Sequence, residues 1–203
     1  MANKDKVYED YEKIADWFDN VRMRDLSFEK PYLDLVASHT KKAGKVLDLG
    51  CGMGEPVTKY FIDNGFQVTG VDGSINMIEK AQRYLPQAKF YVQDMRDLKL
   101  QEKFDAIILW HSLFHLSAED QKLMLKIIAQ HINPGGILLF TTGHKEGEVW
   151  SDNGGENLYH SSLSPTQYQE LLRSNYFKLI LNKIEDPQCG DATVWLAQHV
   201  GLD

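Results

Sequence analysis

Val46-Leu47-Asp48-Leu49-Gly50-Cys51-Gly52-Met53-Gly54 is the stretch of sequence that decides the fold. Its apolar first half is typical of a buried strand, and its closely spaced glycines, followed by Pro56, predict a tight loop that leads into a helix. The first amides of a helix have no partner inside the helix, so they face whatever binds beside the loop. A second predicted strand, residues 67–72, ends in Asp72, where parallel α/β folds place a carboxylate for the hydroxyls of a ribose.

The length and composition of the chain limit its class. A sequence of 203 residues fits one α/β domain with a sizeable core and modest additions. The formal net charge of −7 argues against nucleic acid as the main partner, although it is compatible with a local basic patch. No apolar run is long enough to cross a membrane. The two cysteines, Cys51 and Cys189, and the lack of a secretory signal predict a cytoplasmic location. We expect no metal at Cys51, because no cluster of Cys and His residues surrounds it.

The spacing Asp48-x-Gly50-x-Gly52-x-Gly54, together with Asp72, resembles the cofactor site of class I S-adenosylmethionine-dependent methyltransferases. The dinucleotide fingerprint G-x-G-x-x-G fits less well, because Glu55 stands where its third glycine should be. The resemblance covers residues 44–197 and is most specific up to Asp94. It implies a Rossmann-like seven-stranded α/β sheet with helices on both faces and an antiparallel last strand. It also implies S-adenosyl-L-methionine as the cofactor and S-adenosyl-L-homocysteine as the product.

We expect a single domain, residues 1–203, in four parts. Residues 1–43 form an N-terminal helical lid, 44–142 the cofactor-binding core, 143–163 a substrate flap, and 164–203 a C-terminal helix followed by two strands. The two strands must be antiparallel, because their connection is too short for a parallel crossover. The glycine-rich, polar flap is too long for an ordinary connection. It either builds the acceptor pocket, with Tyr159 and His160 as its best candidates, or is a surface loop pinned by its aromatic side chains.

The resemblance implies roles for side chains at the ends of the predicted strands. Asp72 would accept hydrogen bonds from the ribose, Asp94 and Met95 would recognise adenine, and Asp48 would lie near the methionine ammonium. The amides of the three loop glycines would approach the methionine and the ribose. Tyr11, on a helix predicted over residues 5–19, would help to cover the methionine end. The complete set of predicted cofactor residues is Tyr11, Asp48, Gly50, Cys51, Gly52, Gly54, Asp72, Gly73, Met77, Asp94, Met95 and Trp110.

Some of these residues have a purely structural alternative. Tyr11 lies on the apolar face of an amphipathic helix, so packing on the domain explains it equally well. Core packing is the default for Met77, and an acid after a strand, such as Asp94, is often only a turn former or a helix cap. The helix that contains Met77 is capped by Ser74. We expect that helix to bury Ile75, Ile78, Ala81 and Leu85.

The strand predicted over residues 104–110 delivers His111 and His115 to the sheet edge where doubly wound folds bind ligands. A neutral imidazole accepts a proton near neutral pH, so His111, His115 and His160 are the candidate catalytic residues. The alternative for His115 is packing or capping on the next helix, and the alternative for His111 is lining of the cofactor pocket. The use of a general base stays open, because in-line positioning of the acceptor and the methyl group supplies much of the catalysis.

The sequence therefore predicts a methyltransferase that acts on an unidentified small-molecule acceptor, as a monomer or homodimer. A protein or nucleic-acid methyltransferase would need a basic or aromatic groove beside the site. The acidic balance and the absence of an Asn-Pro-Pro-aromatic signature disfavour that alternative. A nicotinamide-dependent oxidoreductase would have purely parallel strands, and a non-catalytic S-adenosylmethionine-binding protein would lack an open path to an acceptor cavity.

Overall fold

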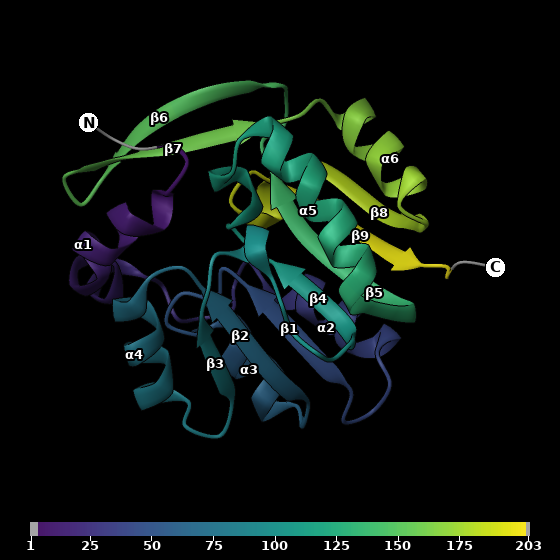
Figure 1. Ribbon diagram of the computed structural model, residues 1–203, viewed down its shortest axis with the longest axis horizontal. Coiled ribbons are helices and arrows are strands. Elements are labelled where there is room, and N and C mark those ends of the chain that lie inside the picture. The colour runs from purple at the N-terminus through teal and green to yellow at the C-terminus, as the bar shows by residue number, and fades with distance from the viewer. Residues whose placement is uncertain (1–3, 202–203) are drawn as a thin grey trace.

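A seven-stranded β-sheet forms the centre of the computed structural model, which describes residues 4–201 (Figure 1). Its strands, in the spatial order β3-β2-β1-β4-β5-β9-β8, are β1 (Lys45–Leu49), β2 (Gln67–Asp72), β3 (Lys89–Val92), β4 (Phe104–Leu109), β5 (Ile132–Thr142), β8 (Phe177–Asp186) and β9 (Ala192–His199). The first five strands run parallel, and β9 is antiparallel to both β5 and β8. The predicted sheet is therefore confirmed. The outer ends of the predicted lid and C-terminal part, residues 1–3 and 202–203, lie outside the described residues.

Helices cover both faces of the sheet, as predicted. On one face α2 (Lys30–His39) and α3 (Val57–Asp63) pack with Val46 of β1, and on the other α5 (Ala118–His131) and α6 (Pro165–Ser174) pack with Leu47 and Leu49. The faces alternate because successive side chains of a strand point to opposite sides. β4 is buried along its whole length, as expected for a strand covered on both faces. No helix within residues 4–201 is long and apolar enough to cross a membrane.

α4 (Ile75–Tyr84) packs against β3 at the edge of the sheet. Ser74 caps this helix as predicted, because its hydroxyl oxygen accepts a hydrogen bond from the amide of Met77 at 3.2 Å. The prediction for Ile75 is wrong. Its side chain is 51% exposed, because Met77 and Ile78 form the inward face of the first turn instead. The other buried residues of the helix include Ala81 and Lys80, and Leu85 follows at its C-cap.

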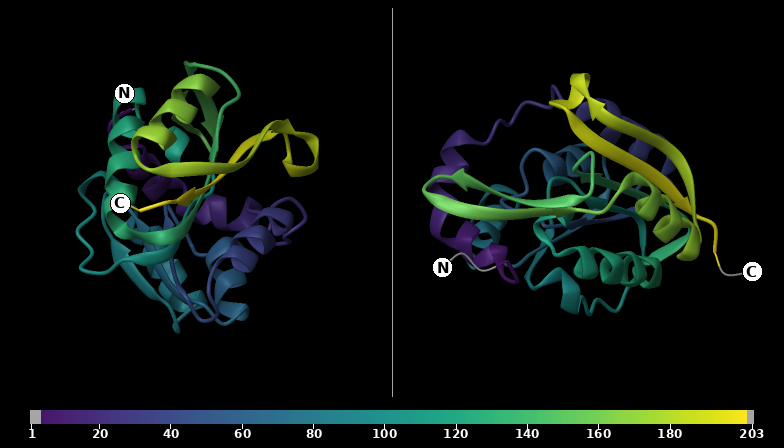
Figure 2. Two further views of the ribbon diagram at one scale, coloured as in Figure 1. Left: turned by 90° about the vertical axis from the view of Figure 1, so that its right-hand side faces the viewer. Right: turned by 90° about the horizontal axis from the view of Figure 1, so that it is seen from above.

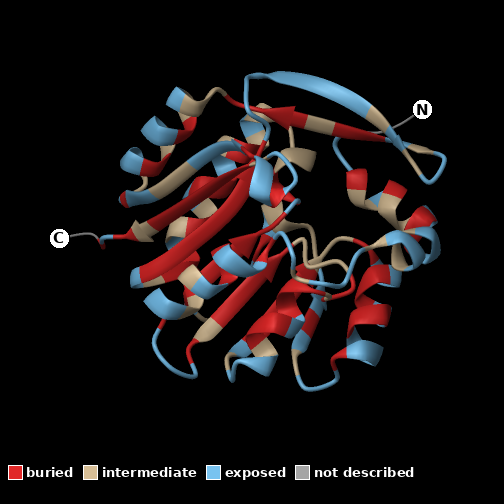
Figure 3. Cartoon of the chain, turned by 180° about the vertical axis from the view of Figure 1, so that it is seen from behind, coloured by how far each residue is buried: buried red, intermediate tan, exposed pale blue. Residues whose placement is uncertain are grey.

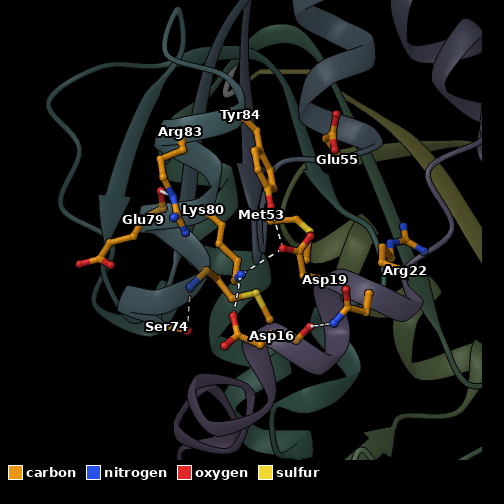
Figure 4. Close-up of polar contacts among 12 residues, drawn as sticks. Asp16, Asp19, Arg22, Met53, Glu55, Ser74, Glu79, Lys80, Arg83 and Tyr84 are labelled. Atoms are coloured by element: carbon orange, nitrogen blue, oxygen red, sulfur yellow. Dashed lines mark hydrogen bonds and ion pairs between the residues drawn. The ribbon is translucent and has the colours of Figure 1, made fainter.

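α1 (Val7–Val21) lies next to α4, and polar contacts fasten the two helices together (Figure 4). The ammonium of Lys80 lies 2.8 Å from the carboxylate of Asp16 and 3.0 Å from that of Asp19. The hydroxyl of Tyr84 also donates to Asp19, at 2.6 Å. The side chain of Lys80 is only 10% exposed, so these ion pairs are less screened by water than ordinary surface pairs. The helix at the N-terminus thus has a fixed place on the core.

Most of the predicted flap is a β-hairpin of two antiparallel strands, β6 (Gly147–Asn153) and β7 (Glu156–Ser162). Its two-residue loop, Gly154-Gly155, has φ angles of 63° and 90°, which glycine adopts without strain. β6 is largely exposed, whereas β7 is largely buried (Figure 3). The connection that the sequence left without regular structure is therefore a separate two-stranded sheet.

The hairpin is held in place by α1 (Figure 2). A two-stranded hairpin is marginally stable alone in water, so it needs such support. At its tip the backbone of Gly154 lies against the ring of Trp17, where an added Cβ would come within 2.6 Å of the indole. Lys13 and Glu156 form an ion pair at 3.0 Å. Three short 3₁₀ helices complete the fold: η1 (Met95–Asp97), η2 (Leu113–His115) and η3 (Pro187–Cys189).

Candidate active site

A cavity of about 320 Å³ lies at the carboxyl ends of β1, β2 and β4, under α1. This volume is typical of a small-molecule site. The predicted cofactor residues other than Gly54, and the three candidate catalytic histidines, line it. They are Tyr11, Asp48, Gly50, Cys51, Gly52, Asp72, Gly73, Met77, Asp94, Met95, Trp110, His111, His115 and His160. Residues more than a hundred positions apart in the sequence therefore share one cavity.

The amides of the glycine loop are occupied inside the protein. The amide of Gly50 donates to the carbonyl oxygen of Val71 at 2.7 Å, and that of Gly52 donates to the carboxylate of Asp72 at 2.9 Å. The amide of Gly54 donates within the loop, to the carbonyl oxygen of Cys51. The expectation that these amides reach toward a ligand thus needs correction, because the loop folds back onto the end of β2. The glycines instead permit the turn and the close packing.

Two of the loop glycines show why no side chain fits there. Gly50 has a φ of 73°, and an added Cβ would lie 2.3 Å from the Cβ of Ser112. Gly54 has a φ of 83° and faces away from the cavity, where an added Cβ would lie 2.8 Å from Leu85. Gly54 was predicted to contact the cofactor, but its position gives it a packing role between the loop and α4.

Asp72 ends β2 with both carboxylate oxygens partly engaged. One accepts from the amide of Gly52 and the other from the amide of Ser74, each at 2.9 Å. Burial raises the pKa of Asp72, and hydrogen bonds from the amides of Ser74, Gly52 and Gly73 oppose that shift. A carboxylate accepts about four hydrogen bonds, so Asp72 can still accept from a ligand hydroxyl.

Asp48 is the most deeply buried acid of the cavity, at 2% exposure. Its carboxylate accepts a hydrogen bond from the hydroxyl of Thr58 at 2.6 Å. Burial, together with the nearby charge of Asp72, raises the pKa of Asp48 to about 7, and the Thr58 hydrogen bond opposes the shift. A cation bound in the cavity would stabilise the ionised form.

Asp94 is held by Arg96, a residue that the sequence did not single out. The guanidinium approaches the carboxylate with Nη2 at 2.6 Å and Nε at 3.0 Å, and its Nη1 lies 3.0 Å from Asp120 on α5. Burial acts to raise the pKa of Asp94, but the hydrogen bonds and charge of Arg96 outweigh it, and the net shift is downward. Asp94 is therefore ionised and fixed in orientation. Its two-residue spacing from Arg96 gave no sequence signal for this clamp.

The three candidate histidines also line the cavity, from the segment that follows β4 and from β7. His115 lies with Nδ1 2.9 Å from the carbonyl oxygen of Tyr159 and Nε2 3.0 Å from the hydroxyl of Tyr11. The ring of His160 is 4.6 Å from that of His115 and 5.3 Å from that of Phe114, measured between centroids. His111 has a φ of 54°, and its amide donates to the hydroxyl oxygen of Thr141 at 2.9 Å.

Burial keeps these imidazoles neutral. It lowers the pKa of His111 to about 4 and that of His115 to about 3, and it lowers the pKa of His160 as well. The backbone of His111 is in the left-handed region, which is unusual for a residue with a side chain and is found often at functional sites. The side of the cavity formed by these rings is thus uncharged at neutral pH.

A second cavity of about 410 Å³ lies beneath the hairpin and shares the rings of Phe114 and His160 with the first. Sequence reasoning missed Phe114, although it stands between two candidate histidines. It also favoured Tyr159, which lines neither cavity. That ring is buried with Val7 and Ile14 in the contact between β7 and α1. The alternation of side chains along β7 explains the difference, because neighbours in a strand face opposite sides.

Known proteins resemble this chain in sequence and fold. Residues 46–136 match the family model described as a methyltransferase domain. The dTDP-3-amino-3,4,6-trideoxy-alpha-D-glucopyranose N,N-dimethyltransferase of Streptomyces venezuelae is 34% identical over 140 residues, 66% of this chain and 57% of that protein. An uncharacterized protein of Haemophilus influenzae is 28% identical over 88% of this chain and 76% of its own length. The solved 1,6-didemethyltoxoflavin-N1-methyltransferase of Burkholderia thailandensis is 21% identical, with a TM-score of 0.75 over 96% of this chain and 88% of that one.

Residues 46–136 thus resemble a methyltransferase domain, and the chain shares the fold of solved S-adenosylmethionine-dependent methyltransferases. It spans about half the length of the first curated relatives that it matches, at 57%, 56% and 51%. At 21% identity, the likeness to the solved Burkholderia enzyme concerns the fold. The chemistry of this protein rests on the residues of its own cavities.

Proposed function

We propose that the protein transfers a methyl group from S-adenosyl-L-methionine to a small-molecule acceptor. The observation that carries this proposal is one cavity with two unlike sides, carboxylates at the ends of β1 and β2 and neutral imidazoles after β4 and on β7. The cofactor, when bound, supplies a methyl group attached to a positively charged sulfur. It also carries an ammonium and a ribose, which suit carboxylates.

Each carboxylate binds a different part of the cofactor. Asp72 accepts hydrogen bonds from the ribose through the acceptor capacity that remains on its carboxylate, and Asp48 pairs with the ammonium. Asp94, kept ionised by Arg96, accepts from the exocyclic amine of adenine, with Met95 beside it. Gly50 and Gly73 pack closely against Ser112 and Tyr8, which leaves no room for side chains of their own at the cavity. The remaining contacts come from Tyr11, Cys51, Gly52, Met77 and Trp110.

His160 is the imidazole best placed to accept a proton from the acceptor. Its Nδ1 lies 3.2 Å from the carbonyl oxygen of Leu158, which only accepts, so Nδ1 carries the hydrogen and Nε2 has a lone pair. Among residues 4–201 no group donates to that Nε2. A proton that leaves the nitrogen or oxygen of the acceptor can therefore pass to Nε2 of His160. Burial, which lowers the pKa of His160, keeps the ring neutral and ready to accept at pH 7.

The hairpin of β6 and β7 shapes the acceptor site. Because the second cavity shares Phe114 and His160 with the first, an acceptor that fills it has its reacting end beside the methyl group. The rings on this side carry no charge at neutral pH, so the acceptor reacts through an uncharged amine, hydroxyl or thiol. Among residues 4–201, no group of three or more His, Cys, Asp or Glu side chains is placed to hold a metal ion.

We further propose that the enzyme is cytoplasmic and works as a monomer or homodimer, with no nucleic-acid or membrane partner. The net charge of −7 supports a small acceptor over an extended polyanion. The name of the Streptomyces relative, an N,N-dimethyltransferase of an amino sugar nucleotide, also supports a small molecule.

Titration calorimetry with S-adenosyl-L-methionine, S-adenosyl-L-homocysteine and NAD tests the cofactor. We expect the first two to bind and NAD not to bind; the opposite preference would overturn the proposal. Incubation with methyl-labelled cofactor and a metabolite extract then identifies the acceptor. If the label enters protein or nucleic acid but no small molecule, the acceptor class is wrong while the cofactor stands.

A further inference from the structure

We propose that His115 is a positioning residue that fixes the hydroxyl of Tyr11 as a hydrogen-bond acceptor facing the cavity. This role deepens and rests on the proposed function, because it concerns how the same cavity recognises its cofactor. It replaces the prediction that His115 is itself a catalytic residue. The two hydrogen bonds of its ring carry the argument.

The partner of Nδ1 determines where the hydrogen of His115 lies. Nδ1 is 2.9 Å from the carbonyl oxygen of Tyr159. A carbonyl oxygen only accepts, so Nδ1 must carry the hydrogen. Burial lowers the pKa of His115 to about 3, so the ring holds a single hydrogen at neutral pH. Nε2 is therefore left with a lone pair.

The partner of Nε2 then fixes the hydroxyl of Tyr11. The hydroxyl oxygen lies 3.0 Å from Nε2, and since this nitrogen has no hydrogen, the hydroxyl donates its own. Burial raises the pKa of Tyr11, so the phenol keeps that hydrogen. Tyr11 lines the cavity, and no other residue of the described chain hydrogen-bonds to its hydroxyl. The oxygen faces a ligand as an acceptor only.

Both ring nitrogens of His115 are engaged in hydrogen bonds, so neither is available to a methyl acceptor. His115 joins η2, which contains it, to β7 through Tyr159 and to α1 through Tyr11. Its ring also packs edge-on against that of Tyr11, with centroids 5.2 Å apart and planes at 76°. Turning either nitrogen toward an acceptor would break a hydrogen bond that holds another element. His160 differs, because its Nε2 has no partner within residues 4–201.

An oxygen that only accepts favours a ligand with positive charge beside it. S-adenosyl-L-methionine has a positively charged sulfur, whereas S-adenosyl-L-homocysteine has a neutral one and otherwise offers the same groups. The pair of Tyr11 and His115 therefore favours the cofactor over its product. This preference is measurable without knowledge of the methyl acceptor.

Titration calorimetry on Tyr11→Phe, His115→Phe and the double variant tests the inference. Each single variant should bind S-adenosyl-L-methionine about three- to tenfold more weakly, with a smaller loss for S-adenosyl-L-homocysteine. The double variant should lose no more affinity than the single variant that binds more weakly, because both substitutions remove the same hydrogen bond. His39→Phe, at an exposed position at the end of α2, serves as the matched control and should bind as wild type. Additive losses, or equal losses for the two ligands, would overturn the proposal.

Imidazole ¹⁵N spectra of the wild-type protein test the tautomer directly, even where a variant fails to fold. We expect a protonated Nδ1 and an unprotonated Nε2 on His115. A hydrogen on Nε2 would overturn the role of His115 and leave the proposed function standing. A wild-type protein with the expected tautomer but no affinity for S-adenosyl-L-methionine would overturn the proposed function instead.

Discussion

Two walls of the first cavity are built in different ways. The loop wall, which consists of residues 50–52 and Asp72, is joined by main-chain amides that donate to the carbonyl oxygen of Val71 and to the carboxylate of Asp72. The ring wall, which consists of His111, Phe114, His115 and His160, brings the rings of Phe114 and His115 on η2 against that of His160 on β7, 46 and 45 positions away in the sequence. The first wall follows from local backbone geometry, and the second depends on where the hairpin docks.

This difference predicts separate consequences for substitutions on the two walls. A change in the loop wall should affect folding and cofactor binding together, because the same atoms serve both. A change at His160 of the ring wall should affect catalysis or selectivity and leave the fold largely intact, because its Nε2 has no partner within residues 4–201. His115 differs, since its ring also joins η2 to β7 and to α1. Substitutions on each wall test this difference between the two walls.

The largest effect is expected on the ring wall. His160→Phe keeps a ring in the stack with Phe114 but removes the lone pair of Nε2, so the turnover rate should fall by about 10²- to 10⁴-fold. Single-turnover kinetics with the acceptor recovered by labelling measure the change, with His39→Phe as the control. In the wild type the rate should fall in acid, only below the ordinary histidine pKa, because burial lowers the pKa of His160. A near-normal rate in the variant would mean that positioning alone drives the reaction.

On the loop wall, Gly50→Ala should cost about 2–5 kcal/mol of stability, since it combines overpacking with an unfavourable φ. The added Cβ would lie 2.3 Å from Ser112, in a residue with a φ of 73°. Gly52→Ala is the matched control, because its φ is 53° but nothing lies within 4 Å of the added Cβ. It should lose only about 1–2 kcal/mol in urea unfolding. Equal losses would show that packing against η2 contributes nothing.

The loop wall was predictable from sequence because its signals are local. Glycines between an apolar run and Pro56 indicate a turn, and an acid at the end of the next strand lies beside it in any parallel sheet. The direction of the loop amides was not predictable, since it depends on how the turn meets Val71. The antiparallel pairing of β8 and β9 followed from their short connection, and the antiparallel last strand was implied by the family resemblance; both are confirmed.

The ring wall was only partly predictable. The sequence Asn153-Gly154-Gly155 is a strong hairpin signal, but β6 lacks the apolar alternation of a typical strand, so the hairpin was not predicted. Which of Tyr159 and His160 faces the cavity depends on register, and a one-residue shift reverses the answer. The clamp of Arg96 on Asp94 and Asp120 joins separate elements and leaves no periodic pattern.

Asp72→Ala comes next in expected size, and it tests whether the loop wall serves folding and binding with the same atoms. The variant should bind S-adenosyl-L-methionine about 100-fold more weakly, because it loses charge-assisted hydrogen bonds to the ribose. It should also lose about 1–3 kcal/mol of stability, since the amides of Gly52 and Ser74 lose their acceptor. Asp72→Asn retains one acceptor oxygen, so its affinity and stability should lie between those of the wild type and Asp72→Ala. Wild-type affinity in the alanine variant would mean that the ribose lies elsewhere.

The smallest effect is a pH dependence that belongs to Asp48. Its pKa is raised to about 7 by burial, so the ionised form that pairs with an ammonium gains population as the pH rises, and affinity should increase about fivefold between pH 6 and pH 7. Asp48→Asn should bind more weakly with no such slope. Without ligand the sign reverses. The raised pKa makes wild-type stability decline as the pH rises from the unfolded value of about 4 to about 7, and the asparagine variant should escape that decline. Calorimetry and urea unfolding across this range measure both slopes. If the two slopes had the same sign, the buried carboxylate would not be the group that receives the cation.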